Sequence, residues 1–191
     1  PTALPPFYVQ VNVDGCDSEV SAPHDVIINP VPVASPSSNS PICEGDDAQL
    51  FGNTIAGATY EWRELGSTVV ISTLQNPVIS NLTTTTSYTL VITANGCSSF
   101  TGQITVTVDP TPVIDNITGG GTFCEGEDVT LTADTEPAGT SYTWTGPNNF
   151  SFTTTLAAAG NPSVTLNGIT ENEEGTYTLV VTSAEGCVSV P

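Results

Sequence analysis

Two cysteine-containing frames alternate along this chain, and their spacing shows that the sequence repeats itself. One frame reads Gly-Cys after a run rich in Thr and Val, and the other reads Cys-Glu-Gly followed by an acid. The Gly-Cys frame occurs at Cys16, Cys97 and Cys187, and the Cys-Glu-Gly frame at Cys43 and Cys124. The spacing from a Gly-Cys frame to the next Cys-Glu-Gly frame is the same both times. Because a fixed period constrains architecture before any local motif does, we expect consecutive copies of one module.

The order of signals within each copy predicts the module boundaries. Residues 1–32 read as the last two strands of a preceding repeat, 33–110 as a full repeat, and 111–191 as a repeat that lacks its last strand. Proline-rich linkers precede both later repeats, at 29–32 and 109–112, and proline blocks strand pairing. A module of about 80–90 residues is large enough to bury the core of a β-sandwich.

Short alternating runs separated by turn residues predict strands throughout. In the last module we expect strands at 113–117, 129–133, 142–144, 150–154, 163–166 and 175–183. The corresponding signals in the second module lie at 48–51, 60–62, 87–93 and 103–108, and the leading segment has strands at 7–13 and through 26–28. Helix signals are nearly absent, although Leu156–Gly160 could form one turn.

An immunoglobulin-like version of the sandwich is favoured by its aromatic residues. Trp62 and Trp144 lie on the third strand of their modules, and Tyr88 and Tyr177 lie on the sixth, so we expect all four in the cores. Tyr177 follows Glu173-Glu174-Gly175-Thr176, a frame that suits a tyrosine corner. The second module lacks the acid and the glycine of that frame. The predicted fold class is therefore all-β, with tandem immunoglobulin-like β-sandwiches in an extended end-to-end array.

The charge of the chain excludes several classes of partner. The formal net charge is −19, and Arg63 is the only basic residue apart from the single histidine. Such a chain repels nucleic acid and anionic membranes, and it contains no apolar run of about 18 residues that would insert into a bilayer. Five cysteines and one histidine suit disulfides in an oxidising compartment better than metal. The chain lacks methionine even at position 1, so we expect it to be processed or excised from a longer protein.

The order Cys-x-Gly turn, Val-Thr-Leu-Thr strand, Tyr-x-Trp strand, Thr-Tyr-Thr-Leu-Val-Val strand and Gly-Cys resembles a known family of repeats. These are the PKD-like and immunoglobulin-like repeats of Bacteroidota surface proteins, which include the type IX-secreted giant adhesins of gliding bacteria. The resemblance covers nearly the whole chain. It implies a cell-surface stalk or adhesin, with no chemistry assigned to the repeats.

Two cysteine pairings remain open. The core positions that an immunoglobulin disulfide occupies are filled by Ala133 and Leu179, and the cysteines lie further out. Within one module, the turn cysteine and the hairpin cysteine would lie at opposite ends of strands that span about 25–35 Å, whereas a disulfide needs Cα atoms within about 7 Å. This argument favours a junction bridge, Cys43–Cys187, between modules. The alternative is two bridges within modules, Cys43–Cys97 and Cys124–Cys187, with Cys16 left over.

No residue pattern predicts catalysis, a cofactor or a metal site. The acids Glu171, Glu173 and Glu174 are expected to form a solvated turn with one capping acid. The acidic clusters at 44–47 and 125–128 could hold calcium at a junction, but no calcium-loop spacing is present. Arg63 is expected to pair with a neighbouring glutamate. Phe150 and Phe152 are the best candidates for an exposed aromatic contact.

The sequence therefore predicts a non-catalytic stalk or adhesion segment of a large extracellular bacterial surface protein or filament. Its partners would be neighbouring repeats of the same chain, and surface glycans or other cells. The alternative is a carbohydrate-binding or accessory module of a secreted hydrolase. The leading strands of one copy could also complete the trailing module of another, giving a homopolymer by strand donation.

Overall fold

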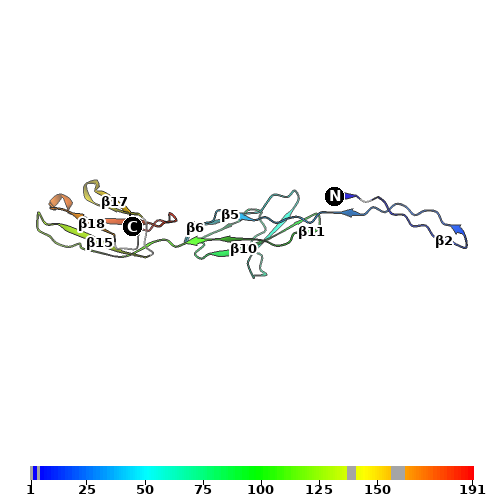
Figure 1. Cartoon of the computed structure of the whole chain (residues 1–191), viewed down its shortest axis with the longest axis horizontal. Coiled ribbons are helices and arrows are strands. Elements are labelled where there is room, and N and C mark those ends of the chain that lie inside the picture. The colour runs from blue at the N-terminus through cyan, green and yellow to red at the C-terminus, as the bar shows by residue number, and fades with distance from the viewer. Residues whose placement is uncertain (1, 4, 137–140, 156–161) are drawn as a thin grey trace. The chain divides into compact units, whose positions relative to one another are not determined.

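The chain, described here by a computed structural model, is all-β: short strands joined by loops, with two short 3-10 helices among the described residues (Figure 1). The structure describes residues 2–3, 5–136, 141–155 and 162–191, so the predicted turn at 156–160 lies outside the described residues. The chain divides into two compact units. The first unit comprises Pro1–Asn39, Ala48–Ile79 and Thr86–Val106, and the second comprises Ser40–Asp47, Ser80–Thr85 and Thr107–Pro191. Three short pieces of the module predicted at 33–110 thus belong to the C-terminal unit, at 40–47, 80–85 and 107–110, and the predicted boundaries at 32 and 110 stay a prediction.

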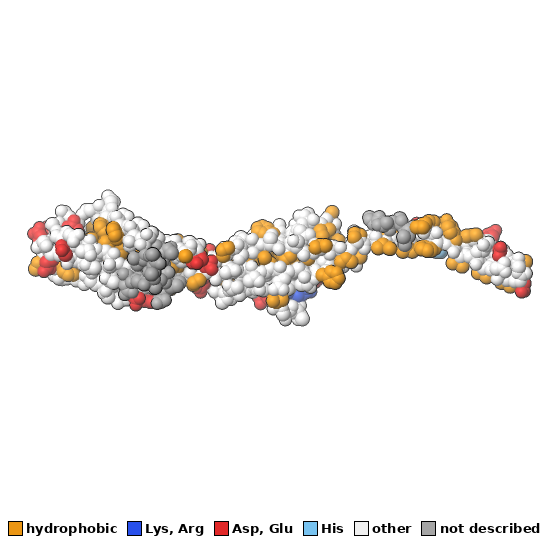
Figure 2. All heavy atoms as spheres, viewed as in Figure 1, with side chains coloured by type: hydrophobic (Ala, Val, Ile, Leu, Met, Phe, Trp, Pro, Cys, Tyr) orange, Lys and Arg blue, Asp and Glu red, His pale blue; other side chains and the backbone are white. Residues whose placement is uncertain are grey.

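The N-terminal segment forms a two-stranded hairpin, but its strands are much shorter than those expected at 7–13 and through 26–28. Strand β2 (Asn12–Val13) pairs with β3 (Cys16–Asp17), and β1 (Thr2–Ala3) pairs with β4 (Ile27–Ile28). Asp14 and Gly15 both have positive φ, at 50° and 85°, which is the backbone that a two-residue hairpin turn requires. The ladders are only two residues long, and many large apolar side chains of the hairpin are exposed (Figure 2).

The first unit contains two small antiparallel sheets. One sheet has the order β5-β7-β9, and in the other β10 pairs with β8, β11 and β12. The strands are β5 (Ser37–Ser38), β7 (Ala48–Phe51), β8 (Thr59–Glu64), β9 (Val78–Ile79), β10 (Thr86–Ala94), β11 (Cys97–Ser98) and β12 (Gly102–Val106). Trp62, Tyr88 and Leu50 are among its fully buried side chains. The strand expected at 103–108 is split in two. Strand β12 pairs with β10 and ends at Val106, and Val108 pairs instead with Ile42.

The second unit repeats this arrangement. Its sheets have the orders β14-β15-β18 and β17-β16-β19. The strands are β14 (Val113–Thr118), β15 (Val129–Glu136), β16 (Ser141–Thr145), β17 (Ser151–Thr155), β18 (Ser163–Leu166) and β19 (Thr178–Thr182). A further parallel pair joins β6 (Ile42–Cys43) to β13 (Val108–Asp109). Short 3-10 helices cover Pro147–Asn149 and Glu171–Glu173. One core cluster combines Val129, Leu131, Ala133 and Val164 from the first sheet with Tyr142, Trp144, Leu179 and Val181 from the second.

The sixth strand of this unit is shorter than the sequence predicted. It begins at Thr178 instead of Gly175, because Gly175 has a φ of +153° and Tyr177 turns its ring back onto the preceding loop. Tyr177 is therefore half-buried at the edge of the core, where its ring meets Phe150 edge-on at a centroid distance of 5.6 Å. Tyr177, which was expected in the core, thus packs against the core cluster as a partly buried residue.

The predicted tyrosine corner is present at Tyr177. Its hydroxyl donates a hydrogen bond to the backbone carbonyl of Glu173 at 2.9 Å. Burial, together with the nearby Glu173 carboxylate, raises the pKa of this hydroxyl, so it remains a proton donor at neutral pH. A Cβ at position 146 would lie 2.5 Å from the tyrosine ring, which explains the glycine there.

Replacing Tyr177 by phenylalanine should lower the free energy of unfolding of the second unit by about 1 kcal/mol, because the ring stays while one hydrogen bond is lost. Denaturant titration followed by circular dichroism measures this as a lower midpoint at unchanged slope. Tyr8→Phe, on the exposed hairpin, is the matched control. Equal stability of both variants and the parent would show that the corner contributes nothing net.

Candidate functional site: a disulfide between successive repeats

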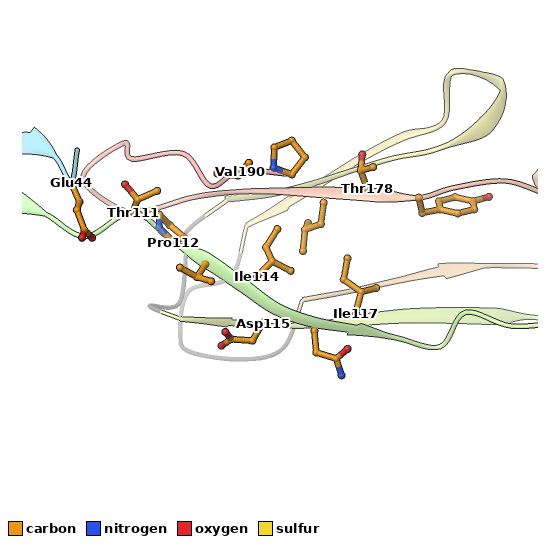
Figure 3. A pocket seen from close by; sticks show the side chains of 13 residues that line it. Glu44, Thr111, Pro112, Ile114, Asp115, Ile117, Thr178 and Val190 are labelled. Carbon is orange, nitrogen blue, oxygen red and sulfur yellow. The ribbon is translucent and has the colours of Figure 1, made fainter. Parts of the chain in front are cut away.

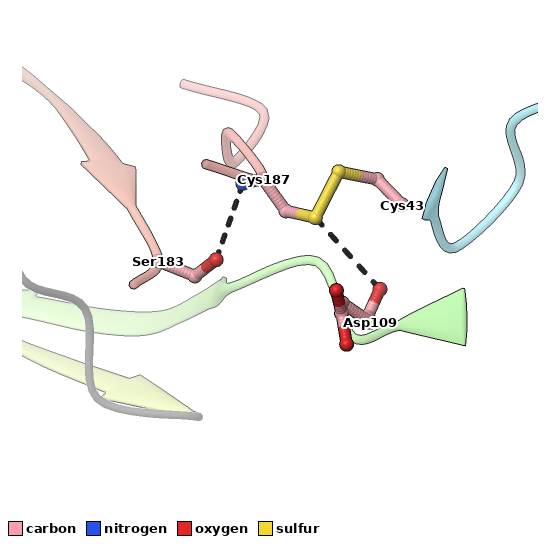
Figure 4. Close-up of a disulfide and its surroundings, with 4 residues drawn as sticks. All are labelled: Cys43, Asp109, Ser183 and Cys187. Atoms are coloured by element: carbon pink, nitrogen blue, oxygen red, sulfur yellow. Dashed lines mark hydrogen bonds between the residues drawn. A yellow bond between two sulfur atoms is a disulfide. The ribbon is translucent and has the colours of Figure 1, made fainter. Parts of the chain in front are cut away.

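A disulfide links Cys43 to Cys187 within the second compact unit (Figure 4). The two Cα atoms lie 5.6 Å apart, and the sequence separation is 144 residues. Cys43 comes from the repeat predicted at 33–110 and Cys187 from the repeat at 111–191. The bridge is thus the junction pairing of the two considered from the sequence, and neither bridge within a module is formed, since Cys97 and Cys124 are free.

Cys43 is positioned by strand pairing on one side and by a tight turn on the other. Strand β6 runs parallel to β13, with Cys43 opposite Asp109. The Cys-Glu-Gly-acid frame then turns, with a 3.0 Å hydrogen bond from the Asp46 amide to the Cys43 carbonyl and a φ of +88° at Gly45. Glycine adopts this φ without the strain that a side chain would cause, which accounts for the glycine of the frame.

Cys187 is positioned by the hairpin that follows β19. Its backbone N–H donates to Ser183 Oγ at 3.1 Å, and its carbonyl accepts from the Ser183 N–H at 2.8 Å. The Cys187 Sγ atom lies 3.9 Å from the carbonyl oxygen of Asp109. This is a packing contact, because a disulfide sulfur carries no proton. Cys187 is 2% exposed, so the bridge is shielded from solvent at this end.

The turn that holds Cys43 is formed again around Cys124. The Glu127 amide donates to the Cys124 carbonyl at 3.2 Å, and Gly126 has a φ of +89°. The Gly126 amide donates a hydrogen bond to the backbone carbonyl of Ile169 at 2.8 Å. In the same way, the Gly45 amide donates to the backbone carbonyl of Leu82 at 2.9 Å. Cys124 itself is exposed and free.

The other free cysteines are hairpin cysteines. Cys16 is exposed at the tip of the N-terminal hairpin, and Cys97 is half-buried after the turn of Asn95 and Gly96. The Cys97 Sγ atom lies 3.7 Å from the carbonyl oxygen of Asn29, in the first linker. The bridged Cys187 sulfur lies against the Asp109 carbonyl in the corresponding place of the second linker, but it has no proton to donate.

The acidic turn has the capping role that the sequence predicted. A Glu173 side-chain oxygen accepts hydrogen bonds from the Thr170 amide and hydroxyl, both at 2.8 Å. These bonds favour the carboxylate and lower the pKa of Glu173. With Thr170 as its N-cap, this is a capping box, which is a structural arrangement and not a catalytic pair.

The remaining candidates from the sequence are dispersed. Arg63 pairs with Glu61 at 2.6 Å on the surface, as expected. Trp62 and Trp144 are fully buried, Phe150 is half-buried, and Phe152 is 41% exposed. Among the described residues no group of three or more His, Cys, Asp or Glu side chains is arranged to hold a metal ion. In that same part of the chain, no helix has the length and apolarity needed to cross a membrane.

One feature of the second unit was missed by sequence reasoning. A groove of about 680 Å³ runs along β14 and the start of β19, and its lining includes Ile114, Ile117 and Leu179 (Figure 3). The groove depends on how the two sheets pack, so no single run of residues in the sequence indicates it.

Comparison with known protein families finds a match for part of the chain. Residues 31–110 match the family described as "Ig-like domain CHU_C associated", and no curated protein matches the chain. Together with the two-sheet strand order, this match confirms the predicted all-β, immunoglobulin-like sandwich.

Several solved structures are similar at low sequence identity. A marsupial T cell receptor is 13% identical with a TM-score of 0.49, over 80% of this chain and 67% of that chain. Extracellular domains 3–5 of Drosophila OTK are 12% identical with a TM-score of 0.41, over 95% of this chain and 68% of that one. A crystal structure of a mouse coronavirus receptor-binding domain complexed with its murine receptor includes a chain that is 17% identical. Its TM-score is 0.44, with coverage of 82% and 94%.

Proposed function

We propose that this chain is a non-catalytic spacer and adhesion segment of a large extracellular bacterial surface protein or filament. The observation that carries the proposal is the Cys43–Cys187 disulfide, which covalently ties one repeat to the next. A bridge at this position closes a loop that contains most of both repeats. It therefore limits how far the chain extends when a force pulls on its two ends.

The setting of the bridge supports an extracellular location. Structural disulfides persist in oxidising compartments and are rare in the cytosol.

The outer faces of the sheets carry uncharged hydroxyl pairs between neighbouring strands. Ser87 with Thr105, Thr130 with Thr165, Thr143 with Thr153 and Thr145 with Thr178 lie 2.7–3.1 Å apart. Such cross-strand pairs stabilise sheets without charge, and with a net charge of −19 they keep the surface soluble.

The finer assignment follows the resemblance described above. We place the segment among the PKD-like and immunoglobulin-like repeats of Bacteroidota adhesins, exported by type IX secretion and associated with gliding. The match of residues 31–110 to an immunoglobulin-like family supports the repeat class. The partners we propose are the neighbouring repeats, and surface glycans or other cells at the exposed faces.

A carbohydrate-binding module of a secreted hydrolase is less well supported. Such a module stacks sugars on exposed aromatic rings. Both tryptophans are fully buried, and the Phe150 ring packs against Tyr177. Of the two tryptophans, Phe150 and Phe152, only Phe152 is exposed, at 41%.

Single-molecule force extension tests the proposed function. With the chain tethered at both ends, the intact bridge should keep the residues between Cys43 and Cys187 from extending, even after both sandwiches unfold. Reduction, or Cys43→Ser, should release about 490 Å of additional length, at about 3.4 Å for each of the 144 residues. Cys124→Ser, which changes the equivalent turn without breaking a bridge, should release none. An oxidised parent chain that already extends to the full length would contradict the proposal.

A further inference from the structure

One parallel strand pair joins the beginning and the end of the repeat predicted at 33–110. Strand β6 lies near the start of that repeat and β13 at its end, and β7–β12 all come between them in the sequence. Ile42 is opposite Val108, and Cys43 is opposite Asp109. Every other strand ladder in the described part of the chain is antiparallel. The pair therefore closes the loop that contains most of the repeat.

A force along the chain pulls these two strands in opposite directions. The load reaches β6 from its N-terminal side and leaves β13 on its C-terminal side. Because the strands run parallel, the force slides one strand past the other along a shared axis. The hydrogen bonds of a parallel pair are evenly spaced, so they carry this load together. Such a pair resists force better than one whose bonds are peeled apart one after another from an end.

Two backbone hydrogen bonds join β6 and its turn to the end of the repeat. The Ile42 amide donates to the Thr107 carbonyl at 3.1 Å, and the Glu44 amide donates to the Asp109 carbonyl at 2.9 Å. These two bonds lie on either side of Cys43.

Two side-chain hydroxyls hold the amides of the same segment. The Thr107 amide donates to Ser40 Oγ at 2.8 Å, and the Val108 amide donates to Thr85 Oγ1 at 3.0 Å. All of these residues belong to the second compact unit. We call the β6–β13 pair, with these backbone and hydroxyl bonds, the clamp.

The Cys43–Cys187 bridge leaves from the clamp itself (Figure 4). Cys43 is the last residue of β6, and Asp109 lies opposite it. With the bridge intact, a load that reaches Cys43 crosses to Cys187 and bypasses the residues between them, so β13 is not loaded. Once the bridge is reduced, the load has to pass through those residues. Strand β5 pairs with β7 through only two residues, and its release leaves the clamp closed.

We propose that the clamp is a second load-bearing contact, which takes over from the Cys43–Cys187 bridge when that bridge is reduced. The inference rests on the proposed function, because it applies to a chain under tension. The bridge limits the length that can be released, and the clamp sets how long the repeat at 33–110 stays closed after the bridge is cut. A reduced segment under load therefore keeps its length for a time set by the clamp.

Glu44→Pro removes one bond of the clamp and preserves the neighbouring turn. Glu44 is the second residue of the turn that the Asp46 amide closes onto the Cys43 carbonyl, and Gly45, the third, has a φ of +88°. This is the pattern of a type II turn, in which proline is favoured at the second position. Because proline has no N–H, the bond to Asp109 is lost.

The test holds the reduced full chain at constant force and measures the lifetime of each folded step, since forced unfolding is governed by the unfolding rate. We expect Glu44→Pro to shorten one lifetime about fivefold, which is the effect of losing one hydrogen bond. That step should release about 220 Å, at about 3.4 Å for each residue from 44 to 107. Thr85→Val removes the acceptor of the Val108 amide and should shorten the same lifetime, so it provides the test if the proline variant does not fold.

Two control variants separate a load-bearing bond from one that only stabilises the fold. Glu125→Pro makes the same change in the turn at Cys124, which belongs to no strand. Tyr60→Phe removes a hydroxyl that donates to the Asn53 carbonyl at 3.2 Å within the same repeat. Tyr60→Phe should lower the denaturation midpoint. Both controls should leave the lifetimes under force within about twofold of the parent, because the contacts that they alter are still intact when the clamp breaks.

The outcomes distinguish this inference from the proposed function. In the oxidised chain Glu44→Pro should not change the extension, because the load bypasses β13. If Glu44→Pro and Thr85→Val both kept the parental lifetime, or if Tyr60→Phe shortened it as much as they do, the clamp would carry no load. The length released on reduction would be unchanged by that result, so the spacer function would stand.

Discussion

Replacing Cys43 by serine is expected to lower the free energy of unfolding by about 2–5 kcal/mol. The bridge spans 144 residues, and the entropy that a cross-link removes from the unfolded chain grows with the length of the closed loop. For loops of about 100 residues or more this treatment gives values near the top of that range. Calorimetry of the oxidised chain against the variant measures the change as a lower midpoint of unfolding.

Cys124→Ser is the matched control for this prediction. It makes the same substitution in a turn with the same hydrogen bonds, but at an exposed cysteine without a bridge. It should change stability by no more than about 0.5 kcal/mol at a dilution where chains stay monomeric. If both variants lost the same stability, the effect would come from the turn and not from the cross-link.

Replacing Trp144 by alanine is expected to cost the second unit about 3–5 kcal/mol. The side chain is fully buried within one cluster, where β15 and β18 face β16 and β19. Removing it loses the transfer free energy of the indole and leaves a cavity that the surrounding strands fill only in part. Denaturation followed by circular dichroism measures the loss, while the fluorescence of Trp62 reports on the first unit in the same sample.

Phe100→Ala provides the comparison for a large aromatic residue outside a core. Phe100 is 90% exposed, so its removal should change stability by less than about 0.5 kcal/mol. A Trp144→Ala variant that unfolded at the parental midpoint would mean that the second core is not packed around this ring.

The second linker contacts both cysteines of the bridge. Asp109 pairs alongside Cys43, and its carbonyl oxygen contacts the Cys187 sulfur. Asn29 holds the corresponding place in the first linker, where its carbonyl oxygen contacts the Cys97 sulfur.

Local features of this protein could be predicted from its sequence alone. The strand at 163–166 was predicted with its observed bounds, Ser163–Leu166. The hydrogen bond from Tyr177 to Glu173 was likewise expected, because it joins residues only four positions apart. These features depend only on residues that are close in the sequence, as do alternating strand patterns, glycine turns and short-range caps. They can therefore be predicted from the sequence directly.

Tertiary structure alone decided the features that depend on distance in space. The sequence left two cysteine pairings open, and only the approach of Cα atoms to 5.6 Å across 144 residues selects Cys43–Cys187. Tyr177 carries a core-like pattern, yet it lies at the edge because the chain bends at Gly175. The groove along β14 and β19 lies between strands that belong to two different sheets. Burial and pairing of this kind are properties of surfaces brought together by folding, and no local run of residues encodes them.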